Sequence, residues 1–412
     1  MPVAPKDKDT LRRLAGEVAQ IAALPVHKEK AAMWRRLNRL EPVRPMVWIN
    51  EVCWEEMGEE AQLTIADPVL RAAERKMRHC LYEWRRLPVD MVVDGWIPSP
   101  LVISDTGFGL DKRVERTKSD IQKNAIDYIP IIRGESDVAK IRPTEVTCDR
   151  AAGDRNAELL DGVLGDLLEV RQVGVTTTWL SPWDTLIQWY GIEELYTDMI
   201  DRPELVRMSI ARMTDVMLDR FEQYERMGLL SLNNANYRVG SGGLGFTDEL
   251  PQRDFDGKRV RMIDMWGNSA PQIFSAVSPE MHWDFALKYE MRILERFGLN
   301  CYGCCEPLHH KVDILRRIPR LRRISMSPFV NVEQGAAAIG QDFIYSAKPN
   351  PAVLASNSWR PDLARRDLAE LLEKTRGLHL EIILKDIHTT RGEPRRLWDW
   401  AKMAMEMVAD CR

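Results

Sequence analysis

The stretch that decides the fold lies at residues 299–307, which read Leu299-Asn300-Cys301-Tyr302-Gly303-Cys304-Cys305-Glu306-Pro307. Three of the chain's seven cysteines fall within five of these positions, at the end of a short apolar stretch. In a barrel of alternating strands and helices, catalytic residues follow the carboxyl ends of the strands. A strand that ends in thiols and a carboxylate therefore predicts a parallel α/β fold with a reactive or metal-binding site at this strand end.

Other short apolar or β-branched runs along the chain have the length of buried strands. Together with the run near residue 300, they predict about eight strands, near residues 47, 91, 175, 230, 300, 324, 344 and 382. Helical periodicity predicts helices at 1–40, 68–86, 155–169, 184–200, 203–227, 279–296, 309–317, 361–376 and 394–408. The alternation implies parallel strands, and their number favours a (β/α)8 TIM barrel over an open doubly wound sheet.

The domain organisation follows from the same pass along the chain. Residues 1–40 are predicted to be an N-terminal helical segment, and residues 41–412 a single barrel domain. Residues 97–172 are less regular and rich in charge, so we interpret them as an insertion into the barrel.

Composition excludes several classes of function. The 412-residue chain has 58 basic and 62 acidic residues, a net charge of −4 that gives no electrostatic case for binding nucleic acid or an anionic membrane. No run of about 18 apolar residues is present, so no membrane span is expected, and the charged first ten residues favour a cytoplasmic location. Seven clustered cysteines do not suggest a disulfide framework.

Polar side chains at the predicted strand ends are the candidate catalytic and substrate-binding residues. We expect Glu51, Asp94 and Asp386 to donate or accept a proton, although Glu51 and Asp94 could instead cap the helices that follow them. The expected substrate-binding residues are Asn50, Trp54, Asn233, Tyr302, Lys348, Asn350 and His388.

The thiol cluster allows two interpretations. Cys304, Cys305 and Glu306 could bind zinc, which a catalytic site usually holds with three protein ligands and one open position. The spacing of Cys301 and Cys304 is C-x2-C, but there is no second such pair, so a zinc ribbon is excluded. Alternatively, one or two of these cysteines belong to the core and a single one is reactive.

A glycine-rich segment at 240–245 matches the pattern G-x-G-x-x-G. It does not follow its strand closely, and the sequence after it does not resemble the start of a long helix, so a dinucleotide-binding fingerprint is rejected. We interpret the segment as a flexible active-site loop.

Several motifs resemble the uroporphyrinogen decarboxylase superfamily. The resemblance covers most of the chain from about residue 40 to the C-terminus, and it implies a (β/α)8 barrel. It is carried by the segments 181–186 (SPWDTL), 191–195 (GIEEL), 201–206 (DRPELV), 304–306 (CCE), 348–351 (KPNP) and 391–394 (RGEP).

The superfamily has two branches with different chemistry. True decarboxylases carry an arginine-containing loop after the first strand to hold substrate carboxylates. Here residues 48–54 contain no arginine, which argues against decarboxylation of a porphyrinogen. The other branch consists of zinc-dependent methyltransferases that work with corrinoid proteins and carry a His-x-Cys pair after a mid-barrel strand.

The chain resembles the methyltransferase branch more closely, but it departs from that branch at two of the expected zinc ligands. Cys304 corresponds to the cysteine of His-x-Cys, but Tyr302 stands where the histidine is expected. Near the last strand, where a third ligand is expected, the chain has no cysteine, so Cys305, Glu306, Asp386 or His388 would have to substitute. The resemblance implies Zn2+, cobalamin carried by a partner corrinoid protein, and a small methylated substrate of the methoxylated (O-demethylation) or methylamine type. A homodimer is left open.

Three alternative functions are also compatible with the sequence. A decarboxylase acting on a small carboxylate would not need zinc and should tolerate loss of Cys304. A non-catalytic metal-binding barrel would bind zinc without methyl transfer. A zinc-dependent lyase or hydrolase would activate water and need no corrinoid protein.

Overall fold

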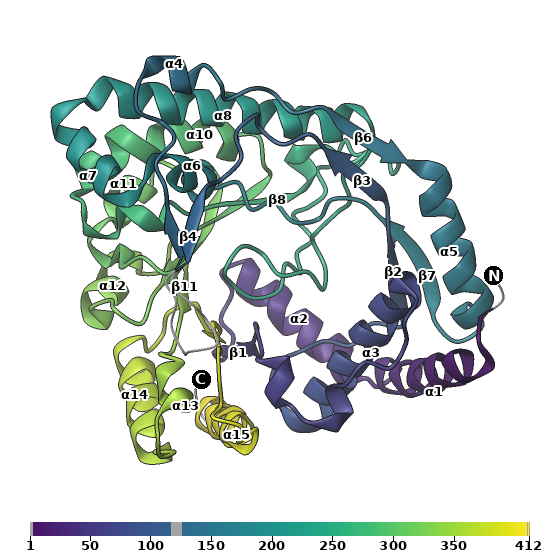
Figure 1. Ribbon diagram of the computed structural model, residues 1–412. Coiled ribbons are helices and arrows are strands. Elements are labelled where there is room, and N and C mark those ends of the chain that lie inside the picture. Colours follow the sequence, from purple (N-terminus) through teal and green to yellow (C-terminus); the bar gives the residue numbers. More distant parts are fainter. Residues whose placement is uncertain (1–2, 117–125, 410, 412) are drawn as a thin grey trace.

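A six-stranded parallel sheet is the centre of the computed structural model, which describes residues 3–116, 126–409 and 411 (Figure 1). The order of its strands is β1-β12-β11-β10-β9-β8, so the first strand of the chain pairs with the last. The bounds are β1 (Met46–Ile49), β8 (Trp266–Ser269), β9 (Leu299–Tyr302), β10 (Leu321–Met326), β11 (Ile344–Ala347) and β12 (Leu380–Leu384).

Further short strands and bridges continue the ring of secondary structure beyond this sheet. β2 (Trp96–Pro100) pairs in parallel with β7 (Glu169–Val173). Single parallel bridges join Val175 to Leu230 and Trp179 to Asn268. The antiparallel pairs are β3 (Val102–Asp105) with β6 (Val146–Asp149) and β4 (Val114–Arg116) with β5 (Ile126–Tyr128).

The predicted strands are therefore confirmed in part. Those near 47, 300, 324, 344 and 382 belong to the parallel sheet. Residues 91–94 form no strand, and the expected strands near 175 and 230 are reduced to one bridge. β8 was not predicted, because Trp266-Gly267-Asn268-Ser269 lacks the β-branched and aliphatic run that marks a buried strand. Six strands form the described parallel sheet, not a closed eight-stranded one.

Helices cover the outside of the ring. The longer ones are α1 (Pro5–Ala22), α2 (Val26–Asn38), α3 (Pro68–Arg86), α5 (Arg150–Leu164), α6 (Pro182–Tyr190), α7 (Ile192–Asp201), α8 (Pro203–Arg226), α10 (Lys288–Leu294), α12 (Val332–Ile339), α14 (Pro361–Lys374) and α15 (Arg395–Ala409). Short helices are α4 (Glu135–Val138), α9 (Pro279–His282), α11 (Val312–Leu315) and α13 (Ala352–Ala355). None of the helices in the described parts of the chain is long and apolar enough to cross a membrane.

The first helix packs against part of the predicted insertion on one side of the ring. α1 contacts α3 and α5, and α5 packs on β7 (Figure 1). The apolar face of α1, with Leu11, Leu14 and Val18, belongs to the same buried cluster as β1 and β12. α1 is thus part of the main hydrophobic core, whereas the buried residues Ala31, Trp34 and Leu37 of α2 belong to a second cluster.

Local chemistry explains which helix bounds were predictable. α3 begins and ends where the sequence predicts, because the Asp67 carboxylate caps the amides of Val69 and Leu70 and Pro68 occupies the first turn. The single helix predicted at 184–200 is divided into α6 and α7 by Gly191, whose φ is 87°. The helix predicted at 279–296 contains a π-helical turn at Trp283–Leu287.

The inside of the curved sheet is filled by a buried polar cluster. Arg323 of β10 and Glu381 of β12 are both fully buried, with Nε and Oε1 3.2 Å apart. Arg323 also donates to Asn38 Oδ1 at 2.7 Å. The glycine-rich segment passes directly over this pair, since a Cβ on Gly242 would lie 2.4 Å from Arg323 Cδ. Only glycine fits at such a distance from two fully buried side chains.

Candidate functional site

The thiol pair sits in a tight turn after β9. Gly303 has a φ of 93°, and a Cβ there would lie 2.4 Å from the Leu308 side chain. The turn is held by two buried serines, because Ser325 Oγ donates to the Cys304 carbonyl and Ser241 Oγ to the Gly303 carbonyl, each at 2.8 Å. Cys304 is buried and Cys305 is exposed, and their sulfur atoms lie 3.4 Å apart.

Lys385, which follows β12, brings a cation to this thiol pair. Its Nζ lies 3.3 Å from the Cys304 sulfur and 3.8 Å from the Cys305 sulfur. The same Nζ lies 2.8 Å from Asp386 Oδ2 and 4.0 Å from Glu51 Oε2. The side chain is only 5% exposed, so this ammonium group is held inside a shell of two thiols and two carboxylates.

Glu51 and Asp386 occupy matching positions at the ends of neighbouring strands β1 and β12. Both adopt the left-handed backbone conformation, with φ of 57°, which is uncommon for residues other than glycine. The amide of Asp386 donates to Glu51 Oε2 at 3.2 Å, and Arg238 donates to Glu51 Oε1 at 2.6 Å. The sheet thus brings together two of the three carboxylates predicted from the sequence to move protons.

The contacts assign different protonation states to the two thiols. The hydrogen bond from Cys304 lowers the pKa of Cys305, and Lys385 lowers it further. The same hydrogen bond raises the pKa of Cys304, and burial adds to that shift. Burial alone would lower the pKa of Lys385, but the adjacent thiols and Asp386 outweigh it and raise that pKa. The arrangement therefore favours a thiolate on the exposed Cys305, facing a charged ammonium group.

Glu306 turns away from the two thiols with which it was predicted to bind zinc. Its carboxylate is fully buried and accepts the Cys304 backbone amide through Oε2 at 2.9 Å. Its Oε1 atom has no partner among the described residues. Within the described parts of the chain, no group of three His, Cys, Asp or Glu side chains is arranged to hold a metal ion. The cation at this position is Lys385, so the residues do not fit zinc.

Two predicted substrate-binding residues instead support the fold. Asn233 is buried and holds β8, accepting the Trp266 amide at 2.9 Å and donating to the Trp266 carbonyl at 3.1 Å. Trp54 stacks on His79 of α3, with ring centroids 3.5 Å apart. Both side chains therefore hold neighbouring parts of the fold in place.

Three further predicted residues lie in different surroundings. Asp94 accepts a hydrogen bond from Asn236 at 2.8 Å and lies apart from the thiols, and burial raises its pKa. Asn50 precedes Glu51, and its side-chain nitrogen is buried with no partner among the described residues. His388 is exposed after β12.

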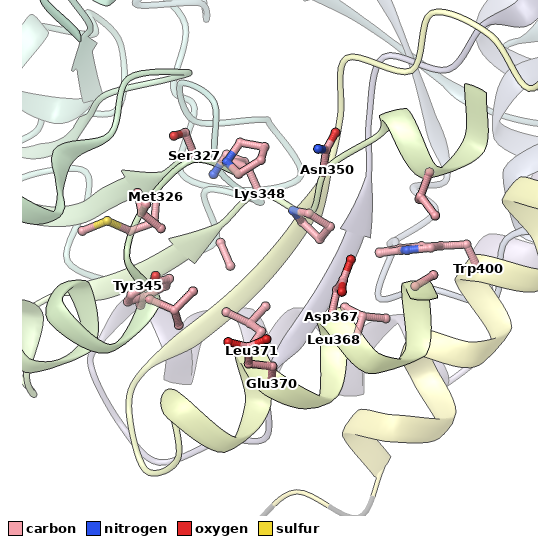
Figure 2. Close-up of a pocket in the computed structure, with 17 residues that line it drawn as sticks. Met326, Ser327, Tyr345, Lys348, Asn350, Asp367, Leu368, Glu370, Leu371 and Trp400 are labelled. Carbon is pink, nitrogen blue, oxygen red and sulfur yellow. The ribbon is translucent and has the colours of Figure 1, made fainter. Parts of the chain in front are cut away.

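Lys348 and Asn350 follow β11 and line a cavity of about 290 Å³ (Figure 2). Lys348 Nζ donates to Ser346 Oγ at 2.6 Å, and burial lowers the pKa of Lys348 to about 8. Asn350 caps the following turn by accepting the Ala352 amide at 3.0 Å. This cavity lies between the sheet and the helices α12, α14 and α15.

The glycine-rich segment 240–245 lies inside the ring rather than at its surface. Ser241, Gly242 and Gly243 are buried, and the Gly243 amide donates to Glu381 Oε1 at 3.1 Å. The segment does not begin a helix, which agrees with the rejection of a dinucleotide site. It is packed on both sides, which differs from the flexible loop that the sequence suggested.

The sequence matches no protein-family model and no curated protein sequence. Among solved structures, the chain is similar to a methyltransferase from Methanosarcina mazei, with a TM-score of 0.49 and 9% sequence identity over 92% of this chain and 98% of that chain. A likeness this slight carries no argument about the reaction. The resemblance to the uroporphyrinogen decarboxylase superfamily therefore stays a prediction, and the site must be interpreted from its own residues.

Lys385 and Arg238 are the site residues whose importance was missed. Lys385 directly precedes Asp386 at a strand end, so its place at the carboxyl edge was visible in the sequence. Its contact with the thiols could not be predicted, because it depends on the order of the strands in the sheet. In that order β12 lies two strands from β10 and three from β9. Arg238 lies in an irregular loop and gave no signal.

Tyr302 faces the opposite side of β9, toward the helices. Its hydroxyl donates to Glu290 Oε2 at 2.6 Å and lies 2.8 Å from His282 Nε2. Ser269 Oγ donates to the other oxygen of Glu290 at 2.8 Å. All four side chains are fully buried, so Tyr302 is part of an internal hydrogen-bond network rather than a substrate contact.

This network predicts a pH dependence of stability. Burial raises the pKa of Glu290 to about 8, with the charge of Glu306 adding to the shift. The folded state therefore keeps a proton that the unfolded state releases above about pH 4.3. The contribution of Glu290 to the free energy of unfolding is complete below that value. It falls by up to about 1.4 kcal/mol per pH unit as the pH rises toward 8.

Urea unfolding of the wild type and Glu290→Gln between pH 5 and 8.5 measures this effect. The difference in unfolding free energy between the two proteins should change steadily over the range. A difference that is constant with pH would show that Glu290 is ionised in the folded protein.

Proposed function

We propose that the chain is a methyltransferase in which the Cys305 thiolate accepts a methyl group from a small methylated substrate. The observation that carries the proposal is the position of Lys385 Nζ, 3.3 and 3.8 Å from the two sulfur atoms. A thiolate, not a thiol, is the nucleophile in such chemistry, and an adjacent cation favours it. Cys305 is the exposed member of the pair and can meet a substrate at the edge of the sheet.

The transfer step is a direct displacement. The Cys305 thiolate attacks the methyl carbon, and a carbon–sulfur bond forms as the bond from methyl to oxygen or nitrogen breaks. The leaving group departs with the electron pair, as a neutral amine from a methylammonium donor or as an oxyanion that takes a proton from water. Cys304 keeps its proton, and Lys385 balances charge at the sulfur before attack.

A partner corrinoid protein is the proposed acceptor of the methyl group. Cobalamin on that partner would supply the strong nucleophile needed to remove a methyl group from a thioether. On this chain, the exposure of Cys305 at the end of β9 is what makes the group accessible to another protein.

The decarboxylase alternative is less well supported, because the cations near the thiols are already engaged, Lys348 by the oxygens of Ser346 and three others by acids. Arg238 is paired with Glu51, Lys385 with Asp386, and Arg323 with Glu381. A substrate carboxylate would have to displace one of these acids.

The proposal predicts a stable methyl adduct on one cysteine. The protein, without any corrinoid protein, is incubated with methyl-labelled donors of both classes, a methoxybenzoate and a methylated ammonium compound. Mass analysis of the peptides should find one methyl group in place of a proton on Cys305 with one class of donor. Cys305→Ser should remove the adduct, and Cys148→Ser, a cysteine outside the site, should retain it.

Two outcomes would contradict the proposal. One is corrinoid-dependent methyl transfer that continues at the wild-type rate in Cys305→Ser. The other is about one zinc per chain in the purified protein that is lost in Cys304→Ala, which would make zinc the cation at the thiols instead of Lys385.

A further inference from the structure

The cavity beside β11 has the size and composition of a ligand site. It measures about 290 Å³, close to the lower end of the range of small-molecule pockets. Its walls are mostly apolar and come from β10 and β11 on one side and from α14 and α15 on the other (Figure 2). The apolar wall residues include Met326, Val353, Leu368 and Leu371.

Two hydrogen-bond donors in this lining lack partners among the described residues. Trp400 of α15 is 1% exposed, and its indole nitrogen donates to none of them. Tyr345 of β11 is fully buried, and its hydroxyl also has no partner there. Figure 2 shows these two side chains on opposite sides of the cavity. The Tyr345 hydroxyl is a buried donor without an acceptor, which costs about 1–3 kcal/mol, so it favours a molecule that supplies an acceptor oxygen, and the Trp400 nitrogen offers a second donor.

The charges around the cavity indicate that this molecule is neutral. Asp367 and Glu370 of α14 lie in its lining, each paired with an exposed cation of the same helix. A ligand carboxylate would have to approach both carboxylates. Lys348 is charged below its pKa of about 8, but the carbonyl and hydroxyl oxygens of Ser346, at 3.0 and 2.6 Å from its Nζ, already use two of its three donors.

We infer that this cavity binds a small neutral ligand with an aromatic or alicyclic body and a carbonyl- or ether-type oxygen. The apolar walls bury the ring, and the oxygen accepts a hydrogen bond from one of the two donors, Tyr345 or Trp400, which face the cavity from opposite sides. The inference stands independently of methyl transfer at Cys305, because it depends only on the lining of the cavity.

Three isosteric probes test the inference by titration calorimetry on the full-length protein. Acetophenone has the ring and a carbonyl, α-methylstyrene replaces the carbonyl by a methylene group, and benzoate carries a negative charge. Acetophenone should bind at least about threefold more tightly than α-methylstyrene and more tightly than benzoate, because one hydrogen bond changes affinity about two- to tenfold. Tighter binding of benzoate would identify an anion site and overturn the inference.

Variants then locate the binding. Of Tyr345→Phe and Trp400→Phe, the one that removes the donor to the oxygen should weaken acetophenone about two- to tenfold while leaving α-methylstyrene almost unchanged, and no effect of either variant would contradict the inference. Val353→Phe should fill the cavity and abolish binding of both. Trp398→Phe is the matched control, because Trp398 lies on the same helix but donates to Tyr82 at 2.9 Å, away from the cavity. Equal binding of acetophenone by the wild type and Val353→Phe would contradict the inference, whatever the result of the methylation test at Cys305.

Discussion

Replacement of Lys385 by methionine is expected to slow alkylation of Cys305 at neutral pH by about tenfold or more, since each unit of thiol pKa changes the thiolate fraction about tenfold. The change removes the ammonium group that lies 3.8 Å from the Cys305 sulfur. It leaves the thiols beside two carboxylates, Asp386 and Glu51, of which Glu51 is paired with Arg238. Both effects raise the pKa of Cys305 from its lowered value in the wild type.

The measurement is the rate of iodoacetamide labelling of the Cys305 peptide between pH 6 and 10, followed by mass spectrometry. The two proteins should differ most below the wild-type pKa and converge above the pKa of the variant. Cys148 provides an internal control in the same samples, because it lies outside the site and should label equally in both proteins. Superimposable pH profiles for Cys305 would mean that Lys385 does not stabilise the thiolate.

Replacement of Arg323 by methionine is expected to reduce the free energy of unfolding by about 3–5 kcal/mol, because it leaves a buried carboxylate without its cation. Arg323 and Glu381 are both fully buried, and Arg323 also holds Asn38 of α2. The loss therefore affects the contact between an N-terminal helix and two central strands. Urea unfolding followed by circular dichroism gives the free energy.

A control variant and a double variant test whether the loss of stability comes from the buried, unpaired charge of Glu381. Arg316→Met removes an exposed arginine paired with Asp342 and should cost no more than about 1 kcal/mol. Arg323→Met combined with Glu381→Leu should recover much of the lost stability, since it removes the uncompensated charge. Equal losses of unfolding free energy in Arg323→Met and Arg316→Met would show that the buried Arg323–Glu381 pair stabilises the fold no more than an exposed ion pair does.

The candidate site could be predicted only where its reactive residues are neighbours in the sequence or directly follow a predicted strand. Cys304 and Cys305 stand out as neighbouring thiols at a strand end, and Glu51 and Asp386 as carboxylates at two others. Glu306 was assigned to the same cluster because it is adjacent in sequence. The turn after Gly303 directs its carboxylate back to the Cys304 amide instead. Side-chain direction within a tight turn depends on backbone angles that residue types do not specify.

The fold shows the same division between local and long-range information. α3 and β12 were predicted well, because a cap, a proline and a continuous apolar run are local signals. β8 was missed because its strand character depends on pairing with β9, and not on its own composition. The left-handed Gly191 divided a predicted helix at a position where periodicity continues across the break.

The pairing of β1 with β12 has a consequence for synthesis of the protein in the cell. β1 leaves the ribosome early, but its partner in the sheet is complete only after residue 384 has been translated. During most of elongation, the apolar Met46–Ile49 segment therefore has no native strand beside it, and it is exposed to non-native contacts and to chaperones. We expect nascent chains that stop before β12 to be captured by chaperones or degraded, and chains released just after it to fold.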